Sequence, residues 1–481
     1  MATPNSKSIA ILGAGITGLT AAHRVAQRGH RIRIFESSSR VGGAIRTERT
    51  DEWLIEAGPN SLLGGEPALV ALLDDLGLAS ERISANSTAR NRYILRRGRL
   101  NPVPLSPPAL LTNPLFSVGA KLRVLAELAT RPRVRTTDVS LEDFIRAHFG
   151  QEIVDYGLNP FIAGVYAGNP KKLSARYAFP KLWEIEQKHG SILRGQMQEA
   201  RSRPRGEIFS FRHGLQTLPD ALAARLPAGA LSLHVRLEAL VLSSTGAEPR
   251  RSLGEGPVPP VSSRSTALSP AAPWSVVWHD GVTTHTENFD AVIAALPAPA
   301  LAQLRFGTLG ERPLAALDGI EHPPVSSLFL GYRREHVAHP LDGFGLLIPE
   351  IEKRTALGVL FSSTLFPHRS PAGHVALTVM IGGTRQPALA RLSSAEILSA
   401  VEPDLRQLLG ATHPPVFLRH TFWPRAIPQY NLGYEQHLET MSAAERTYPR
   451  LFIGGQARDG ISVPACIAAG EKLASRAARI E

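Results

Sequence analysis

Hydrophobic positions near the start of the chain follow two different periods. Residues 9–12 form a short apolar run typical of a buried strand, and residues 19–26 carry apolar side chains at helical spacing. Gly29 follows this helix, and residues 31–35 form a second strand pattern. The pattern therefore predicts a strand–helix–strand unit, which is the opening of a parallel α/β sheet.

Both periods recur along the rest of the chain. Helices are predicted over residues 65–78, 115–128, 141–149, 179–189, 394–409 and 465–478. Strands are predicted over 92–95, 231–242, 274–278 and 289–296, and an antiparallel sheet over 325–383. Residues 163–170 form a glycine-bearing turn pattern. Residues 245–273 are rich in Pro, Ser, Gly and Arg without hydrophobic periodicity, so we expect a flexible insertion there.

The turn between the first strand and helix carries a nucleotide-binding pattern. Residues 13–18 read Gly13, Ala14, Gly15, Ile16, Thr17 and Gly18, which is G-x-G-x-x-G between a strand and a helix. The three glycines allow a tight turn, backbone approach to a pyrophosphate and close packing of helix on strand. Glu36 ends the second strand, where a carboxylate accepts hydrogen bonds from an adenosine ribose.

A second glycine site makes FAD a better candidate than NAD. The stretch after the second strand is similar to the second fingerprint of FAD-binding oxidases, through Glu36, Ser37, Arg40, Gly42, Gly43, Ala44 and Thr47. Its glycine pair lets backbone run beside the same pyrophosphate. Gly58, Pro59, Asn60 and Ser61 match a segment that passes the flavin edge. Gly460, Ile461, Ser462 and Val463 lead into the last helix, whose positive end suits an anionic flavin ring.

Composition narrows the possible partners. Lys and Arg number 53 against 42 Asp and Glu, so the net charge is +11. This charge suits an anionic membrane, a polyanionic substrate or nucleic acid as a partner. Nucleic acid is the weakest of these three candidates, because no recognition motif accompanies the charge. Cys466 is the single cysteine, which excludes a dithiol redox pair. No secretory signal or spanning apolar run is visible, so we expect a cytoplasmic protein.

Residues 115–135 could lie on a membrane surface. Apolar side chains recur at helical spacing from Leu115 to Leu128, and three arginines follow at 131, 133 and 135. An apolar face beside cations suits an anionic bilayer, although a core helix with a solvated end has the same pattern.

The sequence shows no metal-ligand cluster and no second nucleotide fingerprint. The missing second fingerprint therefore favours oxygen or a quinone, rather than a nicotinamide, as the partner that exchanges electrons with the flavin.

Longer strings point to one enzyme family. The chain resembles the oxygen-dependent protoporphyrinogen IX oxidases of haem biosynthesis, flavoenzymes related to coproporphyrinogen III oxidases and to the amine oxidase superfamily. The resemblance covers nearly the whole chain outside 245–273. It is carried mainly by residues 159–170, 179–184, 190–195, 426–433 and 460–463.

The resemblance implies an α/β fold with three interleaved domains. These are a discontinuous Rossmann-like FAD-binding domain, a mixed-sheet substrate domain and an α-helical membrane-binding domain. The FAD domain would comprise residues 1–85, 208–297 and 440–481. The substrate domain would comprise residues 86–106, 181–207 and 298–439, and the helical domain residues 107–180. The implied reaction is six-electron oxidation of a porphyrinogen, with O2 reduced to H2O2.

The resemblance also implies specific site residues. Arg92 matches an arginine near a substrate propionate, and a guanidinium binds carboxylates in bidentate fashion. The turn of Ala163, Gly164 and Val165 matches backbone that lines the tetrapyrrole. Leu346 and Phe361 are expected as apolar walls, and Leu237 on the adenine side of FAD. No catalytic side chain beyond the flavin and no metal are implied.

Three alternatives remain open on the sequence. A coproporphyrinogen III oxidase would share every quoted motif. An amine or carotenoid oxidase-like flavoenzyme would share the N-terminal unit, and a non-catalytic flavin-fold scaffold would lack a reducible flavin. The resemblance also leaves a homodimer open.

Overall fold

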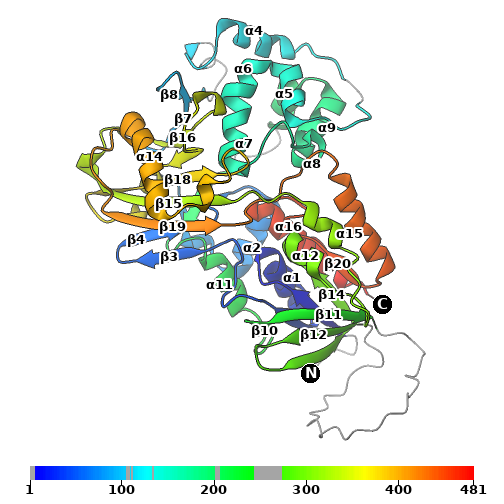
Figure 1. Cartoon of the computed structure of the whole chain (residues 1–481). Helices are drawn as coiled ribbons and strands as arrows, with labels where there is room; N and C mark the ends of the chain where they lie inside the picture. Colours follow the sequence, from blue (N-terminus) through cyan, green and yellow to red (C-terminus); the bar gives the residue numbers. More distant parts are fainter. Residues whose placement is uncertain are drawn as a thin grey trace, which may run out of the picture.

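A parallel five-stranded sheet lies in the lower half of the molecule in Figure 1. The computed structural model describes residues 6–104, 109, 112–132, 135–200, 206–242 and 274–480, so the predicted insertion at 245–273 lies outside the described residues. The strands run in the order β10 (Leu231–Ser232), β2 (Arg31–Phe35), β1 (Ser8–Leu12), β14 (Ala291–Ala294) and β20 (Leu451–Ile453). The predicted strands at 9–12 and 31–35 are confirmed, and segments far apart in sequence complete the sheet.

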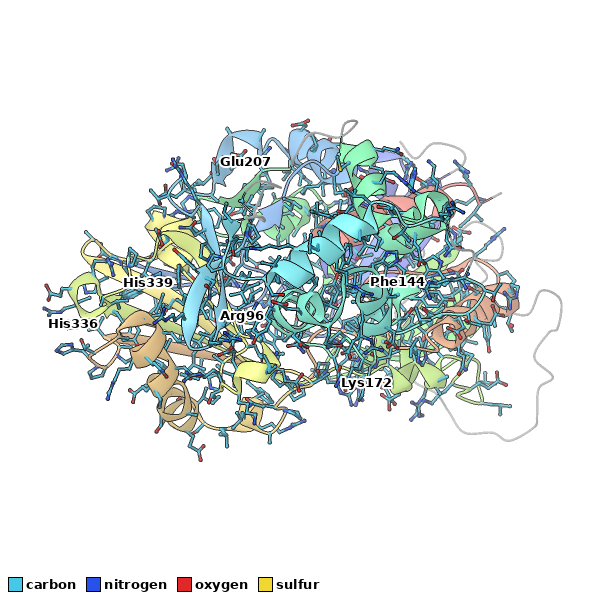
Figure 2. All side chains as sticks on the ribbon, turned by 90° about the horizontal axis from the view of Figure 1, so that it is seen from above. Arg96, Phe144, Lys172, Glu207, His336 and His339 are labelled. Atoms are coloured by element: carbon cyan, nitrogen blue, oxygen red, sulfur yellow. The ribbon has the colours of Figure 1, made fainter. Side chains whose placement is uncertain are left out.

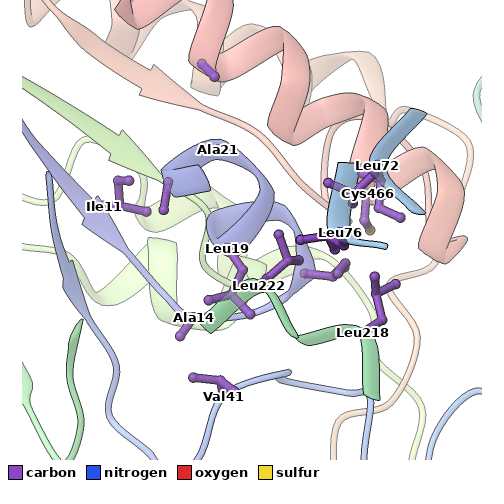
Figure 3. Close-up of a cluster of buried hydrophobic side chains, with 14 of the residues drawn as sticks. Ile11, Ala14, Leu19, Ala21, Val41, Leu72, Leu76, Leu218, Leu222 and Cys466 are labelled. Atoms are coloured by element: carbon purple, nitrogen blue, oxygen red, sulfur yellow. The ribbon is translucent and has the colours of Figure 1, made fainter. Parts of the chain in front are cut away.

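Helices cover one face of this sheet through a continuous apolar core. The core joins β1 to α1 (Ile16–Gln27), α2 (Pro67–Leu76), α11 (Thr217–Ala224) and α16 (Val463–Ala477). Figure 3 shows Leu19, Leu72, Leu222 and Cys466 meeting in it. α1 and α16 approach closely, because a Cβ added to Gly470 would lie 2.6 Å from the Thr17 carbonyl oxygen. This contact sets the first turn of α1 against the middle of α16.

The other face carries a separate antiparallel sheet. It consists of β11 (Arg236–Leu242), β12 (Trp274–His279) and β13 (Thr284–Phe289), and its core includes α12 (Ala298–Gln303) and α15 (Glu435–Thr447). The prediction of one strand over 231–242 is wrong. The chain turns at His234, whose φ is +58°, so β10 joins the parallel sheet and β11 joins the antiparallel one.

A seven-stranded sheet lies above the five-stranded sheet and its helices in Figure 1. Its order is β19 (Phe417–Trp423), β15 (Val325–Arg333), β18 (His374–Gly382), β17 (Gly358–Leu360), β16 (Gly343–Leu347), β7 (Asn91–Arg96) and β8 (Arg99–Pro102). The antiparallel pairing predicted over 325–383 is confirmed, and β7, from outside that range, joins β16 in parallel. α14 (Ser394–Leu409) covers one face and begins with a capping box of Ser393 and Glu396.

Short strands link the two sheets. β3 (Thr47–Thr50) and β4 (Trp53–Glu56) form a hairpin that follows the second glycine site. β9 (Ile208–Phe211) pairs with both β5 (Leu62–Leu63) and β6 (Arg82–Ser84). Trp53 of β4 packs against Phe329 and Phe417 of the seven-stranded sheet. The nucleotide-binding loops are thereby joined to the second sheet.

A helical region lies at the top of Figure 1. It contains α4 (Val118–Glu127), α5 (Leu141–Phe149), α6 (Gln151–Ile153), a π-helical turn (Val154–Leu158), α7 (Asn159–Tyr166), α8 (Ala175–Ala178), α9 (Pro180–His189) and α10 (Ile192–Ala200). The predicted turn at 163–170 is wrong at its start, because Ala163 to Tyr166 are the last turn of α7. The apolar helix continues through these residues, and the chain leaves it at Ala167, whose φ is +52°.

A buried histidine ties the helical region together. In the core near Phe144, labelled in Figure 2, His148 lies 3.0 Å from Glu127 through Nδ1 and 3.0 Å from Glu186 through Nε2. Burial alone would lower the pKa of His148, but the hydrogen bonds to both carboxylates outweigh it and raise the pKa. With an acceptor at each nitrogen, the imidazolium form satisfies both contacts.

We predict that this contact makes stability depend on pH. Because the folded pKa of His148 is raised, its contribution is complete below the unfolded value of about 6.5 and is lost as pH rises through the folded value. Thermal unfolding between about pH 6 and 9 should show a falling Tm that flattens in His148→Gln. The exposed His213→Gln is the control, and an unchanged pH slope in His148→Gln would contradict the prediction.

Candidate cofactor and substrate site

The first glycine turn leaves open space where a ligand would approach. Gly13 has φ +97°, and a Cβ on Gly18 would lie 2.0 Å from the Gly13 carbonyl oxygen, so both positions require glycine for the protein's own packing. Gly15 differs, because an added Cβ would meet no atom within 4 Å. Its φ of −70° and ψ of 172° suit any residue. The protein itself therefore does not explain a glycine at position 15, whereas a bound pyrophosphate does.

The second glycine site meets the first directly. Gly15 and Gly42 form a parallel β-bridge, and the Gly42 N–H donates to the Ala14 carbonyl at 2.8 Å. A Cβ on Gly43 would lie 3.3 Å from the Gly15 Cα. Two loops predicted separately to approach one pyrophosphate thus lie side by side.

Arg40 shapes this second loop. Its guanidinium donates to the carbonyls of Val41 at 3.0 Å, Ile45 at 2.8 Å and Gly43 at 2.6 Å. These bonds hold the loop around Gly42 and Gly43 in place. The structure therefore gives Arg40 a supporting role within the loop, and its predicted contact with the cofactor stays a prediction.

Glu36 is held in place by two backbone donors beside the first glycine loop. Its carboxylate accepts hydrogen bonds from the Ala14 N–H and from the Ser38 N–H, each at 2.8 Å. These two bonds use only part of the accepting capacity of the carboxylate, so lone pairs remain for sugar hydroxyls. Ser37, the next residue, is exposed. The Val235 N–H donates to the Glu36 carbonyl at 2.9 Å, so the strand that carries Leu237 starts next to Glu36. These positions fit the adenosine half of FAD.

The segment from Gly58 to Ser61 is fixed by distant side chains. A Cβ on Gly58 would lie 1.9 Å from the Ala44 carbonyl oxygen, which explains that glycine. Just before it, the Ala57 carbonyl accepts from Trp423 Nε1 at 2.8 Å. The Asn60 carbonyl accepts from Arg369 Nη2 at 2.6 Å. Pro59 lies between these anchors, and the fixed segment runs beside the glycine loops through Ala44.

The N-terminus of α16 completes the site. Ser462 caps the helix and accepts from the Ala465 N–H at 3.2 Å, while Ile461 and Val463 flank the cap. The Gly460 N–H donates to Tyr430 Oη at 3.0 Å. Burial raises the pKa of Tyr430, so the phenol stays neutral and holds the turn. A Cβ on Gly455 would lie 3.6 Å from Thr17 Oγ1, so this turn adjoins the first fingerprint.

Two of these residues were missed by the sequence analysis. Arg369 lies within the predicted antiparallel region, and nothing in its sequence context indicates burial beside Asn60. Tyr430 lies inside the string at 426–433 that carried the resemblance, although no role followed from the string.

Cys466 is buried, and burial raises its pKa to about 12, which makes it an unreactive thiol.

The substrate-side residues gather where α7 meets the seven-stranded sheet. Arg92 is exposed on β7, with its guanidinium 5.6 Å from the Phe344 ring centre. Leu347 of β16 packs against Gly164, since a Cβ there would lie 2.4 Å from Leu347 Cδ2. Val165 is 46% exposed next to this contact, while Ala163 is buried. The structure thus brings Arg92 and the end of α7 to the same face of the sheet.

Leu346 and Phe361 do not lie on this face. Leu346 is 2% exposed and belongs to the core under α14, because successive side chains of a strand point to opposite faces and Leu347 is the one that meets Gly164. Phe361 is fully buried in the same core, with its ring centre 5.5 Å from that of His339. Both side chains are buried in that core, so their role as apolar walls stays a prediction that this packing does not support, whereas Leu347 and Val165 are the apolar side chains beside Gly164.

Comparison with known proteins decides the family of this site. The pattern of the flavin-containing amine oxidoreductase family matches residues 16–478. The chain belongs to this family. It is therefore an oxidoreductase, and FAD is the cofactor that its paired glycine loops, Glu36 and α16 N-terminus fit.

Individual relatives extend along the full chain. Protoporphyrinogen oxidase 2, chloroplastic/mitochondrial, of Arabidopsis thaliana is 33% identical over 98% of this chain and 93% of its own length. Coproporphyrinogen III oxidase of Staphylococcus aureus is 27% identical over 98% of each chain. A crystal structure from Exiguobacterium sp. 255-15 superimposes with a TM-score of 0.78 at 23% identity, covering 98% of this chain and 99% of that one. The last comparison supports the fold alone.

Proposed function

We propose that this protein oxidises protoporphyrinogen IX to protoporphyrin IX in porphyrin biosynthesis, with O2 as acceptor and H2O2 as product. The observation that carries the proposal is the 33% identity to a protoporphyrinogen oxidase over 98% of the chain. The geometry supports it, because Arg92 and the end of α7 lie on one face of the seven-stranded sheet, and the hairpin after the cofactor loops packs on that sheet through Trp53. FAD, when bound, supplies the hydride acceptor and returns electrons to O2.

The protein's own residues bind and orient in this proposal. Glu36, the two glycine loops and the α16 N-terminus hold the dinucleotide. The carbonyls of Ala163, Gly164 and Val165 lie in the last turn of α7, where partners must come from outside the helix, and they can accept pyrrole N–H groups. Arg92 can hold a propionate. Within the described residues no group of three His, Cys, Asp or Glu side chains could hold a metal ion.

Arg92→Ala is expected to weaken substrate binding. A charge-assisted hydrogen bond to a propionate is worth about 1.5 kcal/mol, which corresponds to a roughly tenfold higher KM. Steady-state kinetics with protoporphyrinogen IX measures this, and Arg92→Lys should recover part of the loss. Arg99→Ala, an exposed arginine on the adjacent strand, is the control. A KM unchanged in Arg92→Ala would remove Arg92 from the site.

Coproporphyrinogen III is the second candidate substrate, supported by the Staphylococcus aureus relative. It has two more propionates than protoporphyrinogen IX and would require more cations. Arg92 and Arg96 share a face of β7, but Arg96, labelled in Figure 2, is paired with Glu152 at 2.6 Å. The one remaining guanidinium on this face of β7 favours the substrate with fewer carboxylates. Purified protein given each porphyrinogen tests this: a clear rate preference for coproporphyrinogen III would overturn our choice.

We also propose that α4 rests on a membrane surface. Its exposed side is apolar, with Val118, Leu122 and Leu125 exposed by 71%, 61% and 48%, while Ala120 and Val124 face the core. This stripe, with the exposed Arg123 on α4 and the exposed Arg131 after it, matches an interfacial helix. Of the other two predicted arginines, Arg135 pairs with the buried Glu186 at 2.8 Å, and residue 133 lies outside the described residues. None of the helices in the described ranges is long and apolar enough to cross a bilayer. The cytoplasmic location stays a prediction.

The membrane proposal predicts binding to anionic vesicles. The protein should sediment with phosphatidylglycerol vesicles at low salt, and Leu122→Glu combined with Leu125→Glu should reduce the bound fraction severalfold. Leu309→Glu is the matched control, since Leu309 is 89% exposed but lies outside the helical region. Full recovery of the wild-type protein in the supernatant would contradict the proposal.

A further inference from the structure

α7 is held from outside at both of its ends. Its last turn carries Ala163, Gly164 and Val165, which the proposed function places against the tetrapyrrole, so this inference rests on that function. α7 follows a π-helical turn, and it contacts the seven-stranded sheet through Gly164 and Leu347. The position of the last turn therefore depends on how firmly the helix is attached to that sheet.

A polar cluster attaches the first residue of α7 to the sheet. The Asn159 side-chain oxygen accepts from Arg385 Nη2 at 3.0 Å and from the Glu350 N–H at 2.9 Å, and its amide donates to Glu350 Oε2 at 3.1 Å. Arg385 Nη1 donates to the Ile348 carbonyl at 2.9 Å. Arg385 thus bridges the end of β16 and the start of α7.

The residue before Arg385 attaches the other end. The Thr384 N–H donates to the Ala167 carbonyl at 2.9 Å, and Gln429 Nε2 donates to the Tyr166 carbonyl at 2.8 Å. A Cβ on Gly383 would lie 2.7 Å from the Ala167 carbonyl oxygen, so the loop after β18 approaches closely. Two adjacent loop residues therefore contact opposite ends of the eight-residue helix.

We propose that Arg385 is a positioning residue for the porphyrinogen: together with Thr384 it braces α7 against the sheet and sets the distance between the last turn of α7 and Arg92. The side chain itself is half-buried and contacts Asn159 and Ile348 rather than the site. Its loss should loosen α7 while leaving the cofactor loops, which belong to other elements, undisturbed.

The test separates positioning from folding and from cofactor binding. In Arg385→Met we expect a roughly tenfold higher KM for protoporphyrinogen IX, with kcat within about twofold and with unchanged FAD content and flavin spectrum. Hydrogen exchange should become faster in residues 161–166 and stay unchanged in α5. Arg385→Lys keeps one donor and should recover part of both effects. Arg391→Met, a nearby exposed arginine, is the control.

A second variant removes the same contact from the other side. Asn159→Ala should give the same exchange pattern, and the double variant should be no worse than the more affected single one. Unchanged exchange over 161–166 in both single variants, or an unchanged KM in Arg385→Met, would overturn the proposal. If the wild-type protein oxidises no porphyrinogen, the proposed function fails, while the exchange data still decide whether Arg385 braces α7.

Discussion

Gly15→Ala is expected to fold normally and to lose tight FAD binding. The backbone at position 15 has angles that alanine adopts freely, and an added Cβ meets no protein atom within 4 Å. The methyl group would instead occupy space where two glycine loops converge on the pyrophosphate. We expect FAD affinity to fall by roughly 100-fold, about 2.8 kcal/mol. Because the protein itself tolerates the methyl, the loss would report on the ligand alone.

Fluorescence titration of apoprotein with FAD measures this affinity, and thermal unfolding of apoprotein checks the fold. Gly119→Ala is the matched control, because its Cβ would also meet nothing closer than 3.9 Å and it lies in α4. Gly18→Ala offers the opposite case, since its Cβ collides with the protein and should lower stability as well. Wild-type affinity in Gly15→Ala would place the dinucleotide elsewhere.

Arg369→Met is expected to destabilise the folded protein more than other arginine substitutions. Arg369 is fully buried, 3.6 Å from the equally buried Glu56, and burial lowers the pKa of Arg369 to about 10. Removing one partner of a buried pair leaves the other charge uncompensated, at a cost of about 3–5 kcal/mol. The Asn60 carbonyl also loses its donor, so the flavin-edge segment should become less ordered.

Urea denaturation measures the free energy of unfolding in this series. Arg236→Met is the control, because Arg236 makes an exposed ion pair with Glu238 whose loss should cost at most about 1 kcal/mol. Combining Arg369→Met with Glu56→Gln should recover part of the lost stability, since the stranded carboxylate is then neutral. A change below about 1 kcal/mol in Arg369→Met would show that the pair does not stabilise the fold.

The cofactor half of the site could be predicted from sequence because its information is local. Gly13, Gly15 and Gly18 lie in one turn, and Glu36 follows one strand later, so spacing alone relates them. The capped start of α14 and the left-handed Gly77 at the end of α2 are local in the same way. Each of these features depends on neighbours within a few residues.

The substrate half could not be predicted to the same level because it depends on register and distant contacts. One residue along β16 decides whether Leu346 or Leu347 faces α7, and no periodicity in the sequence resolves that choice. Glycines at 164 and 168 suggested a turn, whereas packing against Leu347 keeps residues 163–166 helical. Arg369 reaches Asn60 across more than 300 positions of sequence, which only the folded chain reveals.

Anaerobic mixing of the purified, FAD-loaded protein with protoporphyrinogen IX tests the central claim most directly. We predict that the yellow flavin absorbance bleaches on mixing, that porphyrin absorbance and fluorescence appear, and that the flavin colour returns when O2 is admitted. A flavin that keeps its absorbance with protoporphyrinogen IX, while a chemical reductant still bleaches it, would contradict the account.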